Sequence, residues 1–467
     1  MNITPSRTKN HDIENAINAI QDVIGTDAGD RGMKALIVDG DLYAASRIFG
    51  ILEPSHVIIL TGFPCCVNES PPTETDGPPG AVALARAAYQ LGHTVTIVTD
   101  DCNKKVFAAA MKDVGHWMKD TSKFKLESFP HTLTEKDTTR LDSLINDCGL
   151  LLALERAGPS SDGMCYTMRG INMNERELIS PIHTIVEKTR GKCWFLAIGD
   201  GGNELGMGKV FASIMKNIPN GEKIGCVIAA DFLIASSVSN WGGYALAAGA
   251  ALMRAEQESM ADNDLGEKVE EWISKCLPTE QEEIHLLERV VRVGCRDGVS
   301  GKMEATVDGM SLETSMKALR DIRKTALLIQ NKEYSLSCHC GKVNATFLCN
   351  RRLITAWDCN CSDCDMRGNV HFIIPSSQLD IVREEWIEAT TEYLWGTKVA
   401  KRRFCKSCGI LPFYTPRSNP DGVAITLACV DWGNENKPEI LTEHFDGVNW
   451  DHSYHTTAIG KSKSVVV

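Results

Sequence analysis

The cysteines in the last third of the chain constrain its fold more than any other feature. Seven of the 18 cysteines form three tight groups, Cys338-His-Cys340, Cys359-Asn-Cys361-Ser-Asp-Cys364 and Cys405-Lys-Ser-Cys408-Gly409. Thiolates suit Zn²⁺, which prefers four tetrahedral protein ligands. A Cys-x-x-Cys-Gly turn lets two sulfurs face one ion, and its glycine frees backbone N–H groups to bond them. A set of unrelated buried thiols is the alternative, and the spacing favours a zinc-binding domain over it.

The number of zinc ions stays open, because seven ligands do not divide into sets of four. One ion can take four sulfurs and be closed, while a second takes three and keeps a position for water or substrate, as catalytic zinc does. The other reading is one structural ion with spare cysteines. Cys349 and Cys429 lie outside the groups, and we expect both in the core. For His339 and His371 we expect a surface or supporting role.

Four motifs in this region resemble a known family: SLSCHCGKV, CNCSDC, RFCKSCG and FYTPRSNPDG. Residues 333–455 are similar to the glutathione-dependent formaldehyde-activating and centromere-protein-V family, and FYTPRSNPDG with HFDGVNW is closest to the second branch. The resemblance implies a β-tent-like zinc domain and carbon–sulfur lyase chemistry on glutathione adducts. After Cys364 the chain departs from the enzymes and reads DMRGNVHFI, so a non-catalytic binding module is the alternative. The implied zinc ligands are Cys338, Cys340, Cys405 and Cys408 for a structural ion, and Cys359, Cys361 and Cys364 for a second.

The first 330 residues alternate apolar runs with helical runs. A helix is expected over 81–92, with Gly92 as its stop, and polar helices over 253–295. Continuous apolar strands between helices predict a doubly wound α/β fold, whose mostly parallel sheet binds ligands at the carboxyl ends of its strands. Near residue 330 the pattern changes to short alternating strands, so we expect domains 1–330 and 331–467. The clearest strands are expected over 55–63, 94–101, 192–202 and 224–236.

The first domain has three polar segments: those at 61–81 and 199–209 follow apolar runs, and the glycine-rich one at 295–313 lies between helical runs. The middle one fits neither the dinucleotide fingerprint nor the Walker pattern. The free N–H groups of this segment can hold an anion, and the alternative is a tight turn that binds no ligand. Long irregular segments at the carboxyl ends of strands are usually functional. The polar residues that these three segments contribute as site candidates are Glu74, Asp76, Asp200, Asn203, Glu204, Asp297, Lys302, Glu304 and Asp308.

These segments carry a second resemblance. PPTETDGPPGA, IGDGGNELGMG and RDGVSGKMEATVDG are similar to the C-terminal domain of the D-glutamate cyclase family, across most of residues 10–325. The family implies conversion of D-glutamate to 5-oxo-D-proline and water, which needs a general base for the amine and a general acid for the leaving oxygen.

The sequence offers candidates for each role in that reaction. Asp200 would orient the substrate ammonium or a metal ion, and Lys302 would hold a substrate carboxylate. Amides around Gly201, Gly202 and Asn203 would hold a carboxylate as well. The acid and base candidates, which the sequence does not separate, are Glu74, Asp76, Glu204 and Asp308.

The two resemblances imply small-molecule partners, D-glutamate and glutathione adducts, and the composition argues against nucleic acid. The net charge is −12, and no basic stripe of the kind that binds nucleic acid is visible. We expect the basic run over residues 401–403 to be a solvated strand edge. No apolar run is long enough for a membrane helix, and no secretory signal is visible. We therefore expect an intracellular protein, in the cytoplasm or mitochondrial matrix, whose other nine cysteines are reduced. Its oligomeric state stays open.

Overall fold

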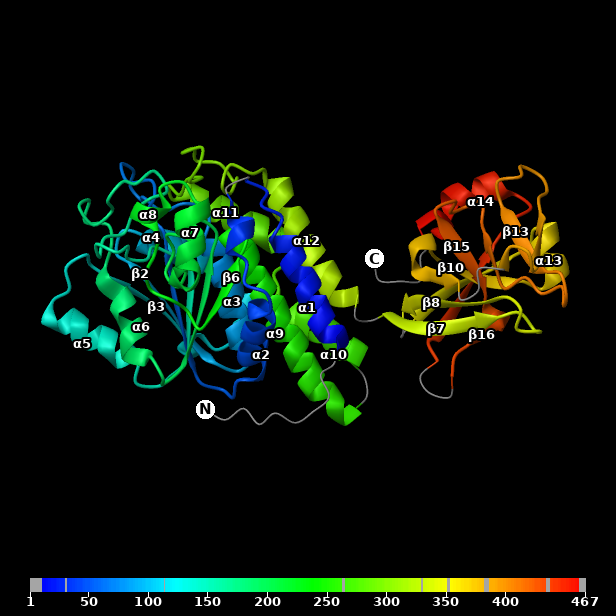
Figure 1. Ribbon diagram of the computed structural model, residues 1–467, viewed down its shortest axis with the longest axis horizontal. Coiled ribbons are helices and arrows are strands. Elements are labelled where there is room, and N and C mark those ends of the chain that lie inside the picture. Colours follow the sequence, from blue (N-terminus) through cyan, green and yellow to red (C-terminus); the bar gives the residue numbers. More distant parts are fainter. Residues whose placement is uncertain are drawn as a thin grey trace. The chain divides into compact units, whose positions relative to one another are not determined.

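The computed structural model divides the chain into two compact units, Met1–Ala326 and Leu327–Val467 (Figure 1). The first unit is built on a parallel sheet with helices, and the second on two sheets that are mostly antiparallel. The structure describes residues 11–29, 32–112, 114–262, 265–328, 331–350, 353–381, 386–433 and 437–461.

The sheet of the first unit has six strands in the order β3-β2-β1-β4-β5-β6, and each neighbouring pair is parallel. From β1 the chain adds β2 and β3 on one side, and it then crosses to the other side of β1, where it adds β4, β5 and β6. The switch point of this doubly wound sheet therefore lies between β1 and β4. The strands are β1 (His56–Gly62), β2 (Thr94–Asp100), β3 (Phe124–Phe129), β4 (Cys148–Arg156), β5 (Trp194–Gly199) and β6 (Phe232–Ala235).

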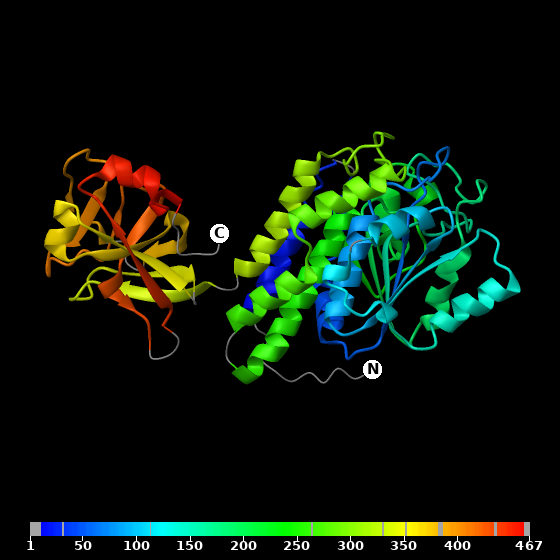
Figure 2. The same cartoon turned by 180° about the vertical axis from the view of Figure 1, so that it is seen from behind.

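Helices cover both faces of this sheet, which confirms the predicted α/β class. On one face, side chains of α5, α6 and α7 join alternate residues of the strands in one buried cluster that includes Ile58 and Leu151. On the other face α3 and α9 pack against the strands, and α1, α2 and α10 contact α9 (Figure 2). The helices are α1 (His11–Ile24), α2 (Asp41–Ile51), α3 (Pro78–Gln90), α4 (Lys104–Ala110), α5 (Glu135–Leu144), α6 (Thr184–Thr189), α7 (Phe211–Asn217), α8 (Gly221–Ile224), α9 (Ser239–Asp262), α10 (Leu265–Cys276), α11 (Glu280–Arg292) and α12 (Leu312–Leu327).

One predicted strand is much shorter than expected. Of residues 224–236, only Phe232–Ala235 pair with the sheet, and Ile224 ends α8. The amides of Cys226 and Ala230 instead donate to carbonyls of Gly202 and Gly206, at 3.0 Å each. The apolar run was misread as a full strand because it is buried against the glycine-rich loop after β5, which it supports.

The second unit contains a seven-stranded sheet, β12-β13-β14-β15-β10-β9-β17, and a four-stranded sheet, β11-β8-β7-β16. All pairs are antiparallel except β9 with β17. Two short helices, α13 (Ser362–Arg367) and α14 (Trp450–Thr456), accompany them. The strands are β7 (Asn331–Ser337), β8 (Asn344–Asn350), β9 (Leu353–Cys359), β10 (Val370–Pro375), β11 (Leu379–Ile381), β12 (Thr390–Tyr393), β13 (Lys401–Cys405), β14 (Phe413–Thr415), β15 (Gly422–Thr426), β16 (Val430–Asp431) and β17 (Glu439–Phe445).

Strand alternation gives the seven-stranded sheet two different buried faces. Phe372 and Phe413 belong to a core shared with the four-stranded sheet. Their chain neighbours Ile373 and Tyr414 belong to a second cluster with Cys359, Cys361 and Cys364. The two faces therefore present different cysteine groups, since Cys338 and Cys405 lie in the first core.

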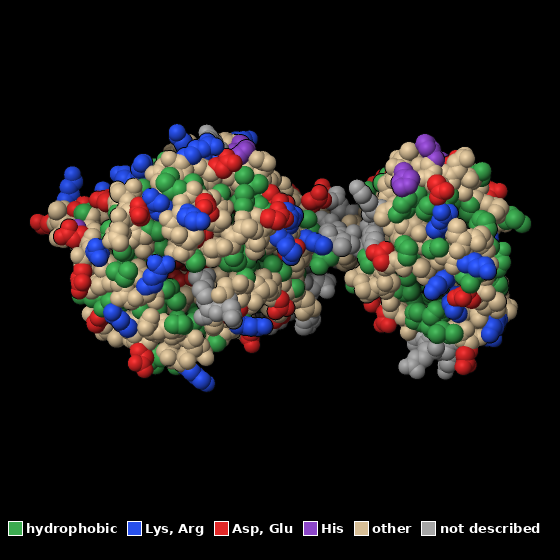
Figure 3. Space-filling model, turned by 90° about the horizontal axis from the view of Figure 1, so that it is seen from above, with side chains coloured by type: hydrophobic (Ala, Val, Ile, Leu, Met, Phe, Trp, Pro, Cys, Tyr) green, Lys and Arg blue, Asp and Glu red, His purple; other side chains and the backbone are tan. Residues whose placement is uncertain are grey.

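The surface carries both signs of charge. On the face drawn in Figure 3, Lys and Arg side chains are interspersed with Asp and Glu side chains on both units. Among the described residues, none of the helices combines the length and apolar character that a membrane span requires.

Candidate functional site

The three polar segments of the first unit converge at the carboxyl edge of its sheet. They enclose a cavity of about 380 Å³ beside the switch point between β1 and β4. Ligands of open α/β sheets bind at this position. The predicted residues in its lining are Glu74, Asp200, Asn203, Glu204 and Asp308, and Glu155 at the end of β4 joins them.

Asp76 is held beside the cavity by the first turn of α9. Its Oδ1 accepts hydrogen bonds from the amides of Gly77 and Asn240, at 3.0 and 2.8 Å, and its Oδ2 accepts one from Ser239 at 2.8 Å. The positive end of a 24-residue helix adds to these donors. These donors fix the position of the Asp76 carboxyl beside the cavity.

Glu204 occupies the amides of its own loop. Its Oε1 accepts from the amides of Asp200 and Gly201, at 3.1 and 2.6 Å, and its Oε2 accepts from Gly202 at 2.7 Å. We predicted that amides of this loop hold a carboxylate of the substrate, whereas in the structure the carboxylate that they bind is that of Glu204 in the same loop. Asn203 also has a local partner, because its Nδ2 donates to the carbonyl of Tyr166 at 2.7 Å.

The surroundings of Glu74 and Glu155 oppose ionisation of their carboxyls. Glu74 is buried, and burial together with the nearby Asp308 and Asp76 raises its pKa well above the ordinary range. Burial and the carboxylates of Asp200 and Glu204 raise the pKa of Glu155 in the same way. The Glu155 Oε2 atom is buried and has no hydrogen-bond partner among the described residues. The cavity wall therefore holds two carboxyls whose surroundings favour the protonated form.

Sequence reasoning missed Glu155, although a signal was present. It is the penultimate residue of β4, an otherwise apolar strand, and its φ of 44° is unusual for a residue other than glycine. A charged residue at the carboxyl end of a central strand marks the functional edge of such a sheet. The next residue, Arg156, points elsewhere and forms a buried ion pair with Asp100 on β2.

The carboxylate oxygens are close enough to act together. One set joins Asp76, Asp200 and Asp308, and a second joins Glu155, Asp200 and Glu204, with the oxygens of each set within 4.8 Å of one another. Oxygen donors of this kind suit a substrate ammonium or a divalent cation such as Mg²⁺ or Mn²⁺.

The segment over residues 295–313 contributes Asp308 but not Lys302. The Lys302 side chain is 68% exposed, lies 3.6 Å from Glu304, and is not part of the cavity lining. Asp297 organises the segment by accepting from the amides of Ser300 and Gly309, at 2.7 and 2.8 Å. Burial opposes ionisation of Asp297, but these bonds hold its pKa below the ordinary value.

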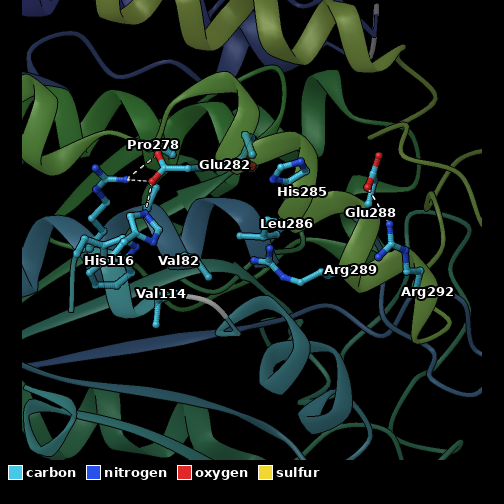
Figure 4. Close-up of a pocket in the computed structure, with 14 residues that line it drawn as sticks. Val82, Val114, His116, Pro278, Glu282, His285, Leu286, Glu288, Arg289 and Arg292 are labelled. Carbon is cyan, nitrogen blue, oxygen red and sulfur yellow. Dashed lines mark hydrogen bonds and ion pairs between the residues drawn. The ribbon is translucent and has the colours of Figure 1, made fainter. Parts of the chain in front are cut away.

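A larger cavity of about 490 Å³ lies between α3, α11 and residues 114–117 (Figure 4). The charge of Arg86 in the wall of this cavity is already paired, because Arg86 binds the Glu282 carboxylate at 3.0 Å, and His116 contacts the same carboxylate. Arg86 also donates to the carbonyls of Ser274 and Lys275. We read this network as the packing of α11 on α3 and not as a ligand site.

In the second unit, four of the predicted ligands form one group. The sulfurs of Cys338, Cys340, Cys405 and Cys408 lie within 4.8 Å of one another. Gly341 and Gly409 follow each pair with φ of 72° and 73°, and the Val343 amide donates to the Cys338 sulfur at 3.3 Å. Four convergent thiols with amide support fit a closed tetrahedral zinc site.

The remaining three ligands form a second group, on the opposite face of the seven-stranded sheet. The sulfurs of Cys359, Cys361 and Cys364 lie within 4.8 Å of one another and line a cavity of about 160 Å³. Cys361 caps α13, with the Cys364 amide 3.5 Å from its sulfur. Hydrogen bonds from the Cys359 and Cys364 thiols, with this amide, lower the pKa of Cys361. Three thiols facing a cavity are compatible with zinc that has an open position.

The prediction that the basic run over residues 401–403 is a solvated strand edge is wrong for one of its residues. Arg402 is 6% exposed and is not part of a solvated edge, because it points from β13 into the cavity and contacts Asp363. Alternation places Lys401 on the other side, in solvent. His371 is also buried in this lining, 3.2 Å from the Tyr414 hydroxyl, whereas His339 is exposed. Cys349 is buried as expected, and Cys429 is half-buried.

Comparisons with known proteins agree with both units. The mitochondrial D-glutamate cyclase of Homo sapiens is 34% identical over 319 residues, which are 63% of this chain and 49% of that protein. The chain thus spans about half the length of this relative. A crystal structure of a Rhodobacter sphaeroides protein is 31% identical and covers 23% of this chain and 99% of its own, with a TM-score of 0.20.

Two family models match, one in each unit. The glutathione-dependent formaldehyde-activating enzyme family matches residues 333–446. The D-glutamate cyclase-like, C-terminal family matches residues 20–323, which is more than half of the chain. The chain therefore belongs to the D-glutamate cyclase-like, C-terminal family and carries a second unit that resembles the glutathione-dependent formaldehyde-activating enzymes.

Proposed function

We propose that the first unit is a hydro-lyase that converts D-glutamate to 5-oxo-D-proline and water. The observation that carries this proposal is one cavity whose wall brings together Glu74 and Glu155, both with raised pKa values, and the carboxylates of Asp200, Glu204 and Asp308. Cyclisation needs both a proton acceptor and a proton donor at one substrate. The name of the human relative supports this choice of substrate.

The proposed roles begin with the substrate ammonium. Asp76, Asp200 and Asp308 place oxygens within 4.8 Å of one another and attract it. Glu155, with its unpartnered buried Oε2, accepts the proton that frees the amine for attack on the γ-carboxyl carbon. Glu155 acts as a base only in its ionised form, and its raised pKa makes that form a stronger base than an ordinary carboxylate.

Glu74 is the proposed acid. Burial and neighbouring anions keep its carboxyl protonated, so it can give a proton to the γ-carboxyl oxygen that departs as water. Backbone amides bind the carboxyls of Asp76 and Glu204 and hold them in place. This proposal assigns the acid and base roles that the sequence alone left open.

The test is product formation by the purified full chain with D-glutamate or L-glutamate, with added Mn²⁺ or with a chelator. We expect 5-oxo-D-proline from the D-isomer alone. Glu74→Gln and Glu155→Gln should each lower turnover by about a hundredfold or more, while Glu304→Gln, outside the cavity lining, should not. Absence of product under both metal conditions would refute the proposal.

For the second unit we propose two zinc ions and carbon–sulfur lyase chemistry on glutathione adducts of aldehydes. Cys338, Cys340, Cys405 and Cys408 would hold a structural ion, and Cys359, Cys361 and Cys364 would hold the other. Support comes from the matching family and from the three-sulfur group in a cavity wall. The second ion would supply a Lewis acid that binds a thiolate. Arg402 would contribute positive charge within the cavity.

A non-catalytic binding module is the alternative for this unit, and zinc content with Cys361→Ser separates the two. We expect about two zinc ions per chain in the parent protein and about one in the variant. An intact fold with lost turnover of a glutathione–formaldehyde adduct supports catalysis. Loss of folding, or an unchanged absence of turnover, supports the binding module. Cys349→Ser, outside both groups, is the matched control.

We infer an intracellular location, in the cytoplasm or the mitochondrial matrix. The human relative is named as mitochondrial, which supports the second compartment. Fractionation of cells that express the tagged full chain tests this inference, and recovery from the culture medium would contradict it.

A further inference from the structure

Two adjacent cysteines lie in the wall of the carboxylate cavity and have no part in the proposed cyclisation. Cys65 and Cys66 follow β1 in the segment that leads to Glu74, and both line the cavity. Their sulfurs are 3.9 Å apart, and both residues are half-buried. Small molecules that enter the cavity therefore reach both thiols.

The two thiols have different surroundings. The Cys65 thiol is within hydrogen-bonding reach of both the Cys66 sulfur and the Glu74 carboxyl, and the Cys66 sulfur, burial and Glu74 raise its pKa. The Cys65 thiol and the positive charge of Arg296 lower the pKa of Cys66 against the effect of burial. Arg296 is fixed by Glu69, whose carboxylate is 2.9 Å away. One thiol is thus set up as a nucleophile and the other as its protonated neighbour.

We propose that Cys65 and Cys66 form a peroxide-sensitive modification site in the wall of the carboxylate cavity. The Cys66 thiolate attacks hydrogen peroxide, so that an S–O bond forms, the O–O bond breaks, and the released hydroxide takes a proton to become water. The Cys65 sulfur then attacks the Cys66 sulfenic acid. An S–S bond forms, the S–O bond breaks, and the hydroxyl leaves as water with the Cys65 proton. Two thiols and one peroxide give one disulfide and two waters.

The modification is reversible and acts on the cavity. Adjacent Cα atoms are about 3.8 Å apart, less than the roughly 4.4 to 6.8 Å of ordinary disulfides, so a small dithiol reductant opens this strained ring readily. Oxidation also removes the S–H donor to Glu74 and changes the shape of the cavity wall beside that residue. The consequence for turnover rests on the proposed cyclase function, but the chemical step does not.

The test treats the full-length, zinc-loaded protein with limiting hydrogen peroxide, blocks free thiols with iodoacetamide and maps peptides by mass. We expect the peptide with Cys65 and Cys66 to lose two hydrogens, to escape alkylation and to recover with dithiothreitol. Cys66→Ser should abolish this change, and Cys65→Ser should trap a sulfenic acid on Cys66 that dimedone labels.

The pair Cys148 and Cys193 provides the matched control. Their sulfurs are 3.5 Å apart at the amino ends of β4 and β5, away from the cavity. Cys148→Ser should leave the modification unchanged, and cyclase activity should fall in parallel with the oxidised fraction. Full alkylation of Cys65 and Cys66 at peroxide doses that oxidise Cys148 or the zinc cysteines would overturn the proposal. Because mass is the readout, this outcome is distinct from a failure of cyclisation.

Discussion

Glu283 should make the stability of the first unit depend on pH. It lies on α11, is 1% exposed, and its Oε1 accepts a hydrogen bond from the Tyr244 hydroxyl at 2.5 Å. Burial raises its pKa from 4.5 to about 7, and the bond from Tyr244 only partly opposes this. The folded unit therefore holds a proton on Glu283 at pH values where the unfolded chain has released it. Glu283→Gln removes this difference with little change in shape.

The sign and size follow from proton linkage. Because the folded pKa is the higher one, the stabilisation is fully present below about pH 4.5 and is lost as the pH rises through about 7. At about 1.4 kcal/mol for each tenfold change in proton affinity, the loss between about pH 5 and pH 8 is roughly 2 to 3 kcal/mol.

Denaturant unfolding across this range measures the effect on the first unit. The free energy of unfolding of the parent protein should fall relative to Glu283→Gln by that amount as the pH rises. Glu288→Gln is the control, because Glu288 is on the same helix with its side chain 44% exposed. A parent and a Glu283→Gln variant with parallel pH profiles would refute the reasoning, since Glu283 would then have an ordinary pKa in the folded unit.

Three further outcomes are expected. Gly298→Ala would place a methyl 1.9 Å from the Glu74 Oε2 atom, so cyclase turnover should fall by roughly a hundredfold. Gly115→Ala is the control and should be neutral, because its methyl meets nothing within 4 Å. Equal activities of the two variants would show that Glu74 is not needed. Arg156→Met would leave Asp100 buried and unpaired, which should cost about 3 kcal/mol or more in denaturant unfolding; a smaller loss would mean that Asp100 is protonated. Chelation of zinc should lower the melting temperature of the second unit only, and a shift of both transitions would contradict separate metal sites.

The sequence predicted the elements whose signals are local. The apolar run that became β1 and the helix before Gly92 lie where periodicity placed them. The two cysteine groups converge as the family resemblance implied, whereas the spacing alone had left their division open. The segment with Asp200 was expected at one edge of the sheet because parallel strands deliver their following loops there, whereas the segment with Asp308 follows α11 and was selected for its polar residues.

What the sequence could not supply depends on contacts between distant segments. Residues 224–236 look like a strand, but their partners are backbone groups of the glycine-rich loop and not of the sheet. Lys302 has the right charge for a substrate carboxylate, yet its segment turns the side chain into solvent. Arg402 was assigned to a solvated edge. Neighbouring residues of a strand point to opposite faces of the sheet, and the sequence of the strand does not show which face its partner strands bury.

The internal hydrogen bonds of Glu204 have a consequence for the kinetics of binding. Glycine-rich loops usually lose conformational freedom when an anion arrives, and that ordering weakens affinity and slows association. Here the carboxylate of Glu204 already gathers the amides of Asp200, Gly201 and Gly202. The loop is therefore ordered before any substrate enters. A substrate should associate without waiting for a loop rearrangement, and its entropy of binding should reflect its own immobilisation and released water, with little contribution from this segment.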